Sequence, residues 1–147
     1  MSQAVDPKLL NGLALAYMGD AVYEQAIRKH LIYTGKTKPN RLHVAATTYV
    51  SAKAQAYLVE QMMEQNLLNE EEMNYYRRGR NAKSHSKAKN ADSMTYSKST
   101  GFESLIGFLY LTEQVERMDV LIVWCIREIE NIEKGETKET MEPRKES

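Results

Sequence analysis

The chain has 147 residues, the usual size of one compact domain, which leaves little room for a second folded unit. Its 20 basic and 20 acidic residues balance, which excludes a global basic field as the basis of nucleic-acid binding. The single cysteine excludes an internal disulfide and a cysteine metal site. We expect a cytoplasmic protein without a membrane span, because no signal-peptide pattern and no uncharged apolar stretch of ~20 residues is found.

The pattern predicts an all-α fold with one compact helical domain over residues 8–132. Long intervals rich in Ala, Leu, Met, Glu, Gln and Lys favour helix, and no period-2 alternation indicates a strand. In chain order, the predicted helices are Leu9 or Leu13 to Leu31, Pro39 to Gln65, Glu70 to about Gly79, Ser99 or Thr100 to Leu111, and Glu116 to about Glu133. The highly charged segment 133–147 is expected to be a disordered tail.

Local signals mark several of these helix ends. Pro39 suits a first helical turn, and Asn69 is a plausible N-cap before an acidic first turn. Ser99 or Thr100 is a candidate N-cap for the fourth helix. The polar, lysine-rich segment 80–95 lacks apolar periodicity and is therefore expected to be a loop.

Asp20 lies in an unusual place for a carboxylate. On a helical wheel the first helix is apolar on two sides, which predicts a central, buried helix with Asp20 within its second apolar side, between Tyr17 and Ile27. Gly19 beside it also weakens the helix by roughly 1 kcal/mol relative to alanine. A Gly-Asp pair in a buried helix indicates close approach of another group, and we expect a functional role for Asp20.

Glu103 poses the same question in the fourth helix, which is apolar almost all round. Burying an unpaired charge costs several kcal/mol, so each carboxylate must pair with a cation, take up a proton or bind a metal ion. For Glu103 a purely structural explanation is equally open, because it would lie in the first turn, where the helix dipole favours an acid. For Cys125, in a long apolar run, a buried inert thiol is expected.

One local cluster of cations stands out between Arg77 and Lys89, where no acidic residue occurs. Duplex phosphates attract such a segment regardless of sequence, although a solvated basic loop is the ordinary alternative for a charge run. The candidate RNA-binding residues of this segment are Arg77, Arg78, Arg80, Asn81, Lys83 and Lys87.

Four segments in a fixed order resemble the ribonuclease III family. They are residues 13–22 (LALAYMGDAV), 49–56 (YVSAKAQA), 77–84 (RRGRNAKS) and 102–111 (FESLIGFLYL). Within the family, the match is best with Mini-ribonuclease III, the bacterial subfamily that consists of the catalytic domain alone, and it covers roughly residues 8 to 130.

The resemblance implies a homodimer that cleaves double-stranded RNA with Mg²⁺, usually in maturation of 23S ribosomal RNA. Asp20 matches the aspartate of the signature helix and Glu103 the glutamate of the second acidic motif, both catalytic and metal-site residues in the family. The wider family carries further carboxylates one turn before each, where this sequence has Ala16 and Thr100. This difference leaves the number of metal ions open.

Two other functions compete with the enzyme. A non-catalytic RNA-binding protein of the same fold would lose the need for Asp20 and Glu103, both of which are present. A helical protein-interaction module would not bind duplex RNA even at low salt. A cleavage assay on wild type and Asp20→Asn distinguishes the enzyme from the non-catalytic RNA-binding protein.

Overall fold

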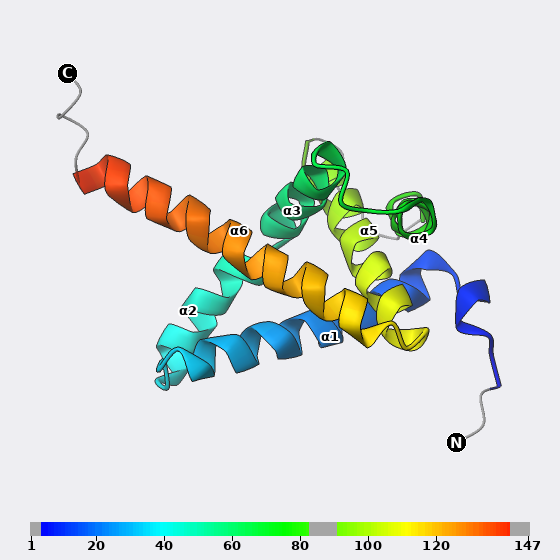
Figure 1. Ribbon diagram of the computed structural model, residues 1–147, viewed down its shortest axis with the longest axis horizontal. Helices are drawn as coiled ribbons and strands as arrows, with labels where there is room; N and C mark the ends of the chain where they lie inside the picture. The colour runs from blue at the N-terminus through cyan, green and yellow to red at the C-terminus, as the bar shows by residue number, and fades with distance from the viewer. Residues whose placement is uncertain (1–3, 83–90, 142–147) are drawn as a thin grey trace.

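A computed structural model of the chain describes residues 4–82 and 91–141. Within them the protein is helical, with no strand, and the predicted all-α fold is confirmed (Figure 1). A short 3-10 helix, η1 (Pro7–Leu9), precedes six α-helices: α1 (Gly12–Tyr33), α2 (Pro39–Val50), α3 (Ala52–Glu64), α4 (Glu70–Arg80), α5 (Ala91–Leu111) and α6 (Val115–Met141). None of the described helices is long and apolar enough to cross a bilayer.

The predicted long second helix is wrong, because the chain breaks it at Ser51. The backbone of Ser51 is extended, with φ −64° and ψ 157°, and its side chain accepts a hydrogen bond from the Ala54 amide. Ser51 is therefore the C-cap of α2 and the N-cap of α3 at once. Alanine-rich flanks favour helix on both sides but do not prevent a serine from capping between them.

The predicted start of the fourth helix is also wrong, since α5 begins at Ala91. Neither Ser99 nor Thr100 caps it. Both hydroxyls donate to the Tyr96 carbonyl oxygen, at 2.8 and 3.0 Å, which is the backward hydrogen bond of a serine or threonine inside a helix. The polar residues 91–95 that lack an apolar pattern form the first turns of α5 instead of a loop.

The last helix extends beyond its predicted end. Helix α6 continues to Met141, past residue 133, where the charged tail was expected to begin. Glutamate and lysine are good helix formers, and adding a residue to an existing helix costs far less than starting one. Residues 142–147 lie outside the described part of the chain.

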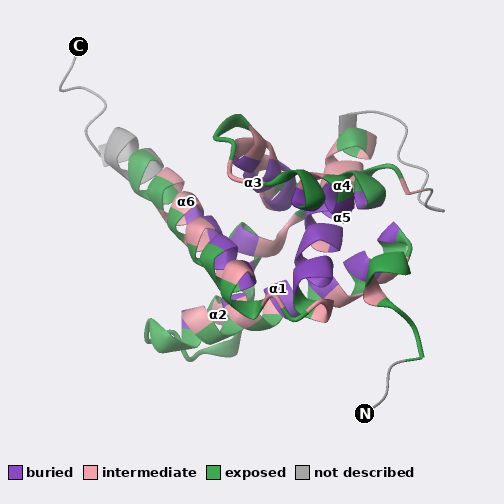
Figure 2. Cartoon of the chain, turned by 45° about the vertical axis from the view of Figure 1, so that its right-hand side comes forward, coloured by how far each residue is buried: buried purple, intermediate pink, exposed green. Residues whose placement is uncertain are grey.

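Helix α5 forms the centre of the molecule. It packs against α1, α3 and α4, and the buried residues gather along α5 and on the helix sides that face it (Figure 2). Its residues Phe102, Leu105, Ile106, Phe108 and Leu109 are all fully buried. Helix α6 covers another side of the core, and Cys125 is one of its buried residues. Burial raises the pKa of the Cys125 thiol, as expected for an inert thiol.

The acidic start of α4 is fixed by a complete capping box. Asn69 accepts from the Glu72 amide at 2.8 Å, and Glu72 accepts from the Asn69 amide at 3.0 Å, which confirms the predicted N-cap. Arg117 on α6 donates to both carboxylate oxygens of Glu72, at 2.8 and 2.9 Å, and to the Leu67 carbonyl oxygen. Burial opposes the charge on Glu72, but the Arg117 and Asn69 hydrogen bonds outweigh it and lower its pKa.

Candidate active site

Two glycines let α1 and α5 cross with their backbones in contact. A Cβ added at Gly19 would lie 1.8 Å from the Glu103 carbonyl oxygen, and one added at Gly107 would lie 1.9 Å from the Leu15 carbonyl oxygen. No larger residue fits either position without moving a helix backbone. The close approach that the Gly-Asp pair predicts is therefore the contact with α5, and it places Asp20 beside Glu103.

The environment of Glu103 raises its carboxyl pKa to about 8. Burial is the largest cause, followed by the negative charge of Asp20 and a side-chain hydrogen bond with Asp20. A hydrogen bond from Gln55 acts in the opposite direction and favours the charged form. The two carboxyl groups thus meet closely, and with no cation between them burial and the charge of Asp20 keep Glu103 protonated near neutral pH.

The burial of these two residues differs from the sequence prediction in two respects. Asp20 is exposed, and Tyr17 on the same side of α1 is 84% exposed, so this half of the predicted buried side faces solvent. Glu103 lies in the middle of α5, far from its first turn, and the dipole explanation offered for it is wrong. Of the two carboxylates, Glu103 is therefore the one whose charged form is destabilised by burial, and Asp20 is the one accessible to solvent.

Gln55 is a site residue that sequence reasoning missed. It lies on α3, is only 2% exposed, and hydrogen-bonds the Glu103 carboxyl group. The segment 49–56 is one of the family motifs, but an amide on an alanine-rich helix gives no sign of its partner. What identifies Gln55 is its burial, because a buried polar side chain requires a hydrogen-bond partner. That burial depends on how the helices pack.

The predicted RNA-binding cluster begins at the C-terminal end of α4. Arg77, Arg78, Arg80 and Asn81 are exposed there, while Lys83 and Lys87 lie outside the described residues. Three arginines in the last turn of α4 also suit the negative end of the helix dipole, so part of this charge has a structural explanation.

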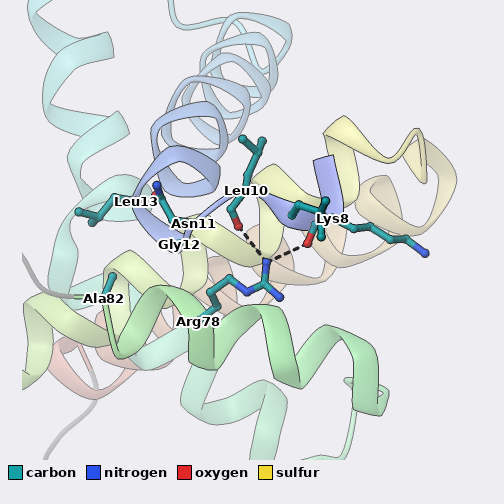
Figure 3. A pocket seen from close by; sticks show the side chains of 8 residues that line it. Lys8, Leu10, Asn11, Gly12, Leu13, Arg78 and Ala82 are labelled. Atoms are coloured by element: carbon teal, nitrogen blue, oxygen red, sulfur yellow. Dashed lines mark hydrogen bonds between the residues drawn. The ribbon is translucent and has the colours of Figure 1, made fainter. Parts of the chain in front are cut away.

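Arg78 holds the N-terminal segment in place. Its guanidinium donates to the carbonyl oxygens of Lys8 and Leu10, at 2.9 and 2.8 Å (Figure 3). It also lies 4.4 Å from the centre of the Tyr75 ring. The Tyr75 hydroxyl donates to the same Lys8 carbonyl oxygen at 3.0 Å. Arg77 donates to the Asn74 side chain, and Arg80 donates to the Asn81 side chain and lies 5.9 Å from the centre of the Tyr76 ring. Neither has a carboxylate partner among the described residues, so their charges are freer to meet phosphate.

The Ribonuclease III domain model matches residues 13–114, which run from α1 through α5. The chain belongs to the ribonuclease III family. It is 56% identical to Mini-ribonuclease 3 of Streptococcus pneumoniae, over 86% of this chain and 98% of that protein. It is 59% identical to Mini-ribonuclease 3 of Enterococcus faecalis, over 91% and 98%. A crystal structure of a Fusobacterium nucleatum protein superposes with TM-score 0.70 and 30% identity, over 81% and 93%.

Membership of the ribonuclease III family confirms the resemblance drawn from the four motifs, and it implies a divalent metal cofactor. The donor set fits such an ion. Asp20 and Glu103 supply carboxylate oxygens, which Mg²⁺ prefers, and a cation would oppose the burial and the Asp20 charge that raise the Glu103 pKa. Among the described residues no group of three or more His, Cys, Asp or Glu is placed to hold a metal ion, so the candidate site rests on two carboxylates.

The two positions where the wider family has further carboxylates are packed into the core here. Ala16 is 5% and Thr100 7% exposed, and the Thr100 hydroxyl is bonded to its own helix. Only Asp20 and Glu103 therefore remain as carboxylates at this place, and an octahedral ion bound there would need other ligands to complete its shell.

Proposed function

We propose that this protein is a magnesium-dependent endoribonuclease that cleaves double-stranded RNA, with Asp20 and Glu103 as its catalytic and metal-binding residues. The convergence of these two carboxyl groups from helices distant in the chain carries the proposal. Membership of the ribonuclease III family supports it, because the family acts on double-stranded RNA with a divalent metal.

Each residue of the site has a distinct part in this chemistry. Asp20 is exposed and accessible to an arriving phosphate, whereas Glu103 lies behind it and must lose its proton before both groups are charged. Gln55 fixes the orientation of Glu103 and favours its charged form. When bound, Mg²⁺ would polarise the scissile phosphate and make a bound water more acidic.

Recognition is expected to follow the shape and phosphates of an A-form duplex, because its deep major groove hides the base edges from side chains. Arg77, Arg80 and Asn81 at the end of α4, with Lys83 and Lys87, are the proposed phosphate contacts. Arg78 supports them by holding the N-terminal segment. The family resemblance points to the 23S ribosomal RNA precursor in the cytoplasm, which mapping of 23S RNA ends in cells lacking the protein would test.

A homodimer is supported by an exposed apolar stripe beside the site. Leu13 and Tyr17, four residues apart on α1, are 42% and 84% exposed, and Leu9 in η1, just before this helix, is 78% exposed. Large apolar residues that gather on a surface mark an interface, and a second copy would bury the α1 side that the sequence predicts to be buried. Sedimentation should give a dimer, and Leu13→Glu with Tyr17→Glu should give a monomer; a wild-type monomer would contradict the dimer.

A cleavage assay on duplex RNA tests the proposed activity. Wild type should cut in Mg²⁺ and not in EDTA, and Asp20→Asn should lose at least 10²-fold in rate while still binding the duplex, since charge stabilisation of this kind is worth about that much. Asp119→Asn, an exposed aspartate on α6, is the matched control and should cut like wild type. Binding without cutting by wild type would favour the non-catalytic RNA-binding alternative.

A further inference from the structure

The cations of this neutral chain are unevenly distributed. Between Glu24 and Glu60 there is no acidic residue, although the whole chain carries as many acids as bases. The basic residues of this stretch are Arg28, Lys29, Lys36, Lys38, Arg41 and Lys53. Five of them fall in residues 28–41, which form the end of α1, the turn and the start of α2, and which we call the basic hairpin.

These cations do little for the fold. All five side chains of the basic hairpin are exposed, and within the part of the chain that the structure describes only Arg28 has an acidic partner, Glu24 at 2.7 Å. Lys38 and Arg41 lie at the start of α2, where the helix dipole disfavours a cation, and Lys38 makes no side-chain capping bond. Arg28 has its Glu24 partner and Lys29 lies 5.8 Å from the centre of the Tyr33 ring, but folding alone gives no reason for Lys36, Lys38 and Arg41.

The basic hairpin is held in a fixed position relative to the carboxylates. His30 lies 2.7 Å from a Glu130 carboxylate oxygen, and the Tyr49 hydroxyl donates to the same oxygen at 3.1 Å, which joins α1, α2 and α6. The Tyr23 hydroxyl donates to the Tyr49 carbonyl oxygen and joins α1 to α2 a second time. A charged surface on such a scaffold keeps one geometry toward a ligand.

An open groove connects the hairpin to the candidate site. It has a volume of about 490 Å³, its walls include Asp20 and Glu24, and it meets the basic hairpin at Arg28. A second hollow of about 280 Å³ continues from Arg28 to His43 on α2. Asp20 and Arg28 are eight residues apart on α1, which is about 12 Å along the helix. A strand at the carboxylates would reach the hairpin within a few nucleotides.

The two basic segments lie at opposite ends of α1. The end of α4 contacts the start of α1, where a Cβ on Gly12 would meet the Arg78 carbonyl oxygen at 2.4 Å, and the basic hairpin lies at the other end (Figure 1). Helix α1 has 22 residues and a length of roughly 33 Å, with Asp20 between its ends. A duplex centred on the carboxylates would therefore meet cations on both sides.

We infer that the basic hairpin is a second phosphate-binding surface, which holds the backbone of duplex RNA on the side of the carboxylates opposite to α4. The inference rests on the proposed function for the identity of the ligand. Its contacts are to phosphate, so they give affinity and placement of the duplex without sequence preference.

The test compares two double variants that lose the same charges. Lys36→Gln with Arg41→Gln removes one lysine and one arginine from the basic hairpin, and Arg127→Gln with Lys134→Gln removes the same pair from exposed positions on α6. Binding of a short labelled RNA duplex is measured by fluorescence anisotropy in EDTA over a range of salt concentrations. The hairpin variant should bind more weakly, and its slope of log affinity against log salt should fall by about two, one unit per lost phosphate contact.

The control variant should keep the wild-type slope, and circular dichroism should show all three proteins equally helical. Equal slopes for wild type and hairpin variant, or equal losses in both variants, would overturn the inference. A wild type that neither binds nor cuts the duplex would instead contradict the proposed function. Lys36→Cys gives an independent readout, because Cys125 is buried: a photocrosslinker on the introduced thiol should label the duplex, whereas one placed through Arg127→Cys should not.

Discussion

Replacing Glu103 with glutamine should make the metal-free protein more stable at alkaline pH. The folded pKa of Glu103, about 8, lies above the ordinary value of 4.5, so the folded state holds a proton that the unfolded state releases. Stability should therefore fall as pH rises through this window, by up to ~1.4 kcal/mol per pH unit. Allowing for the water that reaches this half-buried group, Glu103→Gln should gain about 2–4 kcal/mol over wild type at pH 8.5.

Urea unfolding in EDTA at a fixed protein concentration, repeated at pH 5, 6, 7 and 8.5, measures this difference. The two proteins should be nearly equally stable at pH 5 and should diverge as pH rises. Glu64→Gln, an exposed carboxylate on α3, is the control and should follow wild type throughout. Adding Mg²⁺ at pH 8.5 should stabilise wild type and not Glu103→Gln. A difference between the two proteins that stays constant with pH would refute the reasoning.

Two further predictions concern the packing that holds the site. Gly19→Ala forces a Cβ against the Glu103 backbone and should cost about 3 kcal/mol or more of unfolding free energy, whereas Gly135→Ala, with open space around it, should be neutral or stabilising in thermal unfolding. Arg117→Met leaves Glu72 buried without its partner and should cost about 3–5 kcal/mol at pH 7. Because pairing with Arg117 lowers the pKa of Glu72, the loss of unfolding free energy in Arg117→Met should shrink as pH falls through the Glu72 pKa. A loss that does not change with pH would argue against the pairing.

Local signals predicted the helices well and their junctions poorly. The Asn69 N-cap was predicted from the residues that follow it, because such a cap depends only on its own neighbours. Ser51 and the start of α5 were missed for opposite reasons. Around Ser51 the composition favours helix, so the break between α2 and α3 was not predicted. Residues 91–95 are polar, so their helix, which continues into the buried part of α5, was not predicted either.

The site shows the same division. Sequence singled out Asp20 and Glu103, since a carboxylate in an apolar helix is unusual enough to need an explanation. It misassigned their burial, and it gave no role to Gln55 and no structural role to Arg78. Burial depends on which side of each helix meets another helix, and periodicity within one helix does not contain that information. The catalytic and RNA-binding roles stay predictions until the assays are done.

The sequence by itself determined the helical class, the family and the two acidic residues, because composition, caps and motif order are local properties of the chain. Only the tertiary structure decided that Gly19 and Gly107 bring α1 and α5 into backbone contact, that Glu103 is the desolvated member of the pair, and that a groove runs from Asp20 to Arg28 of the basic hairpin. Those properties depend on contacts between segments far apart in the chain. The distance between two groups and the water that remains around them determine their interaction energy.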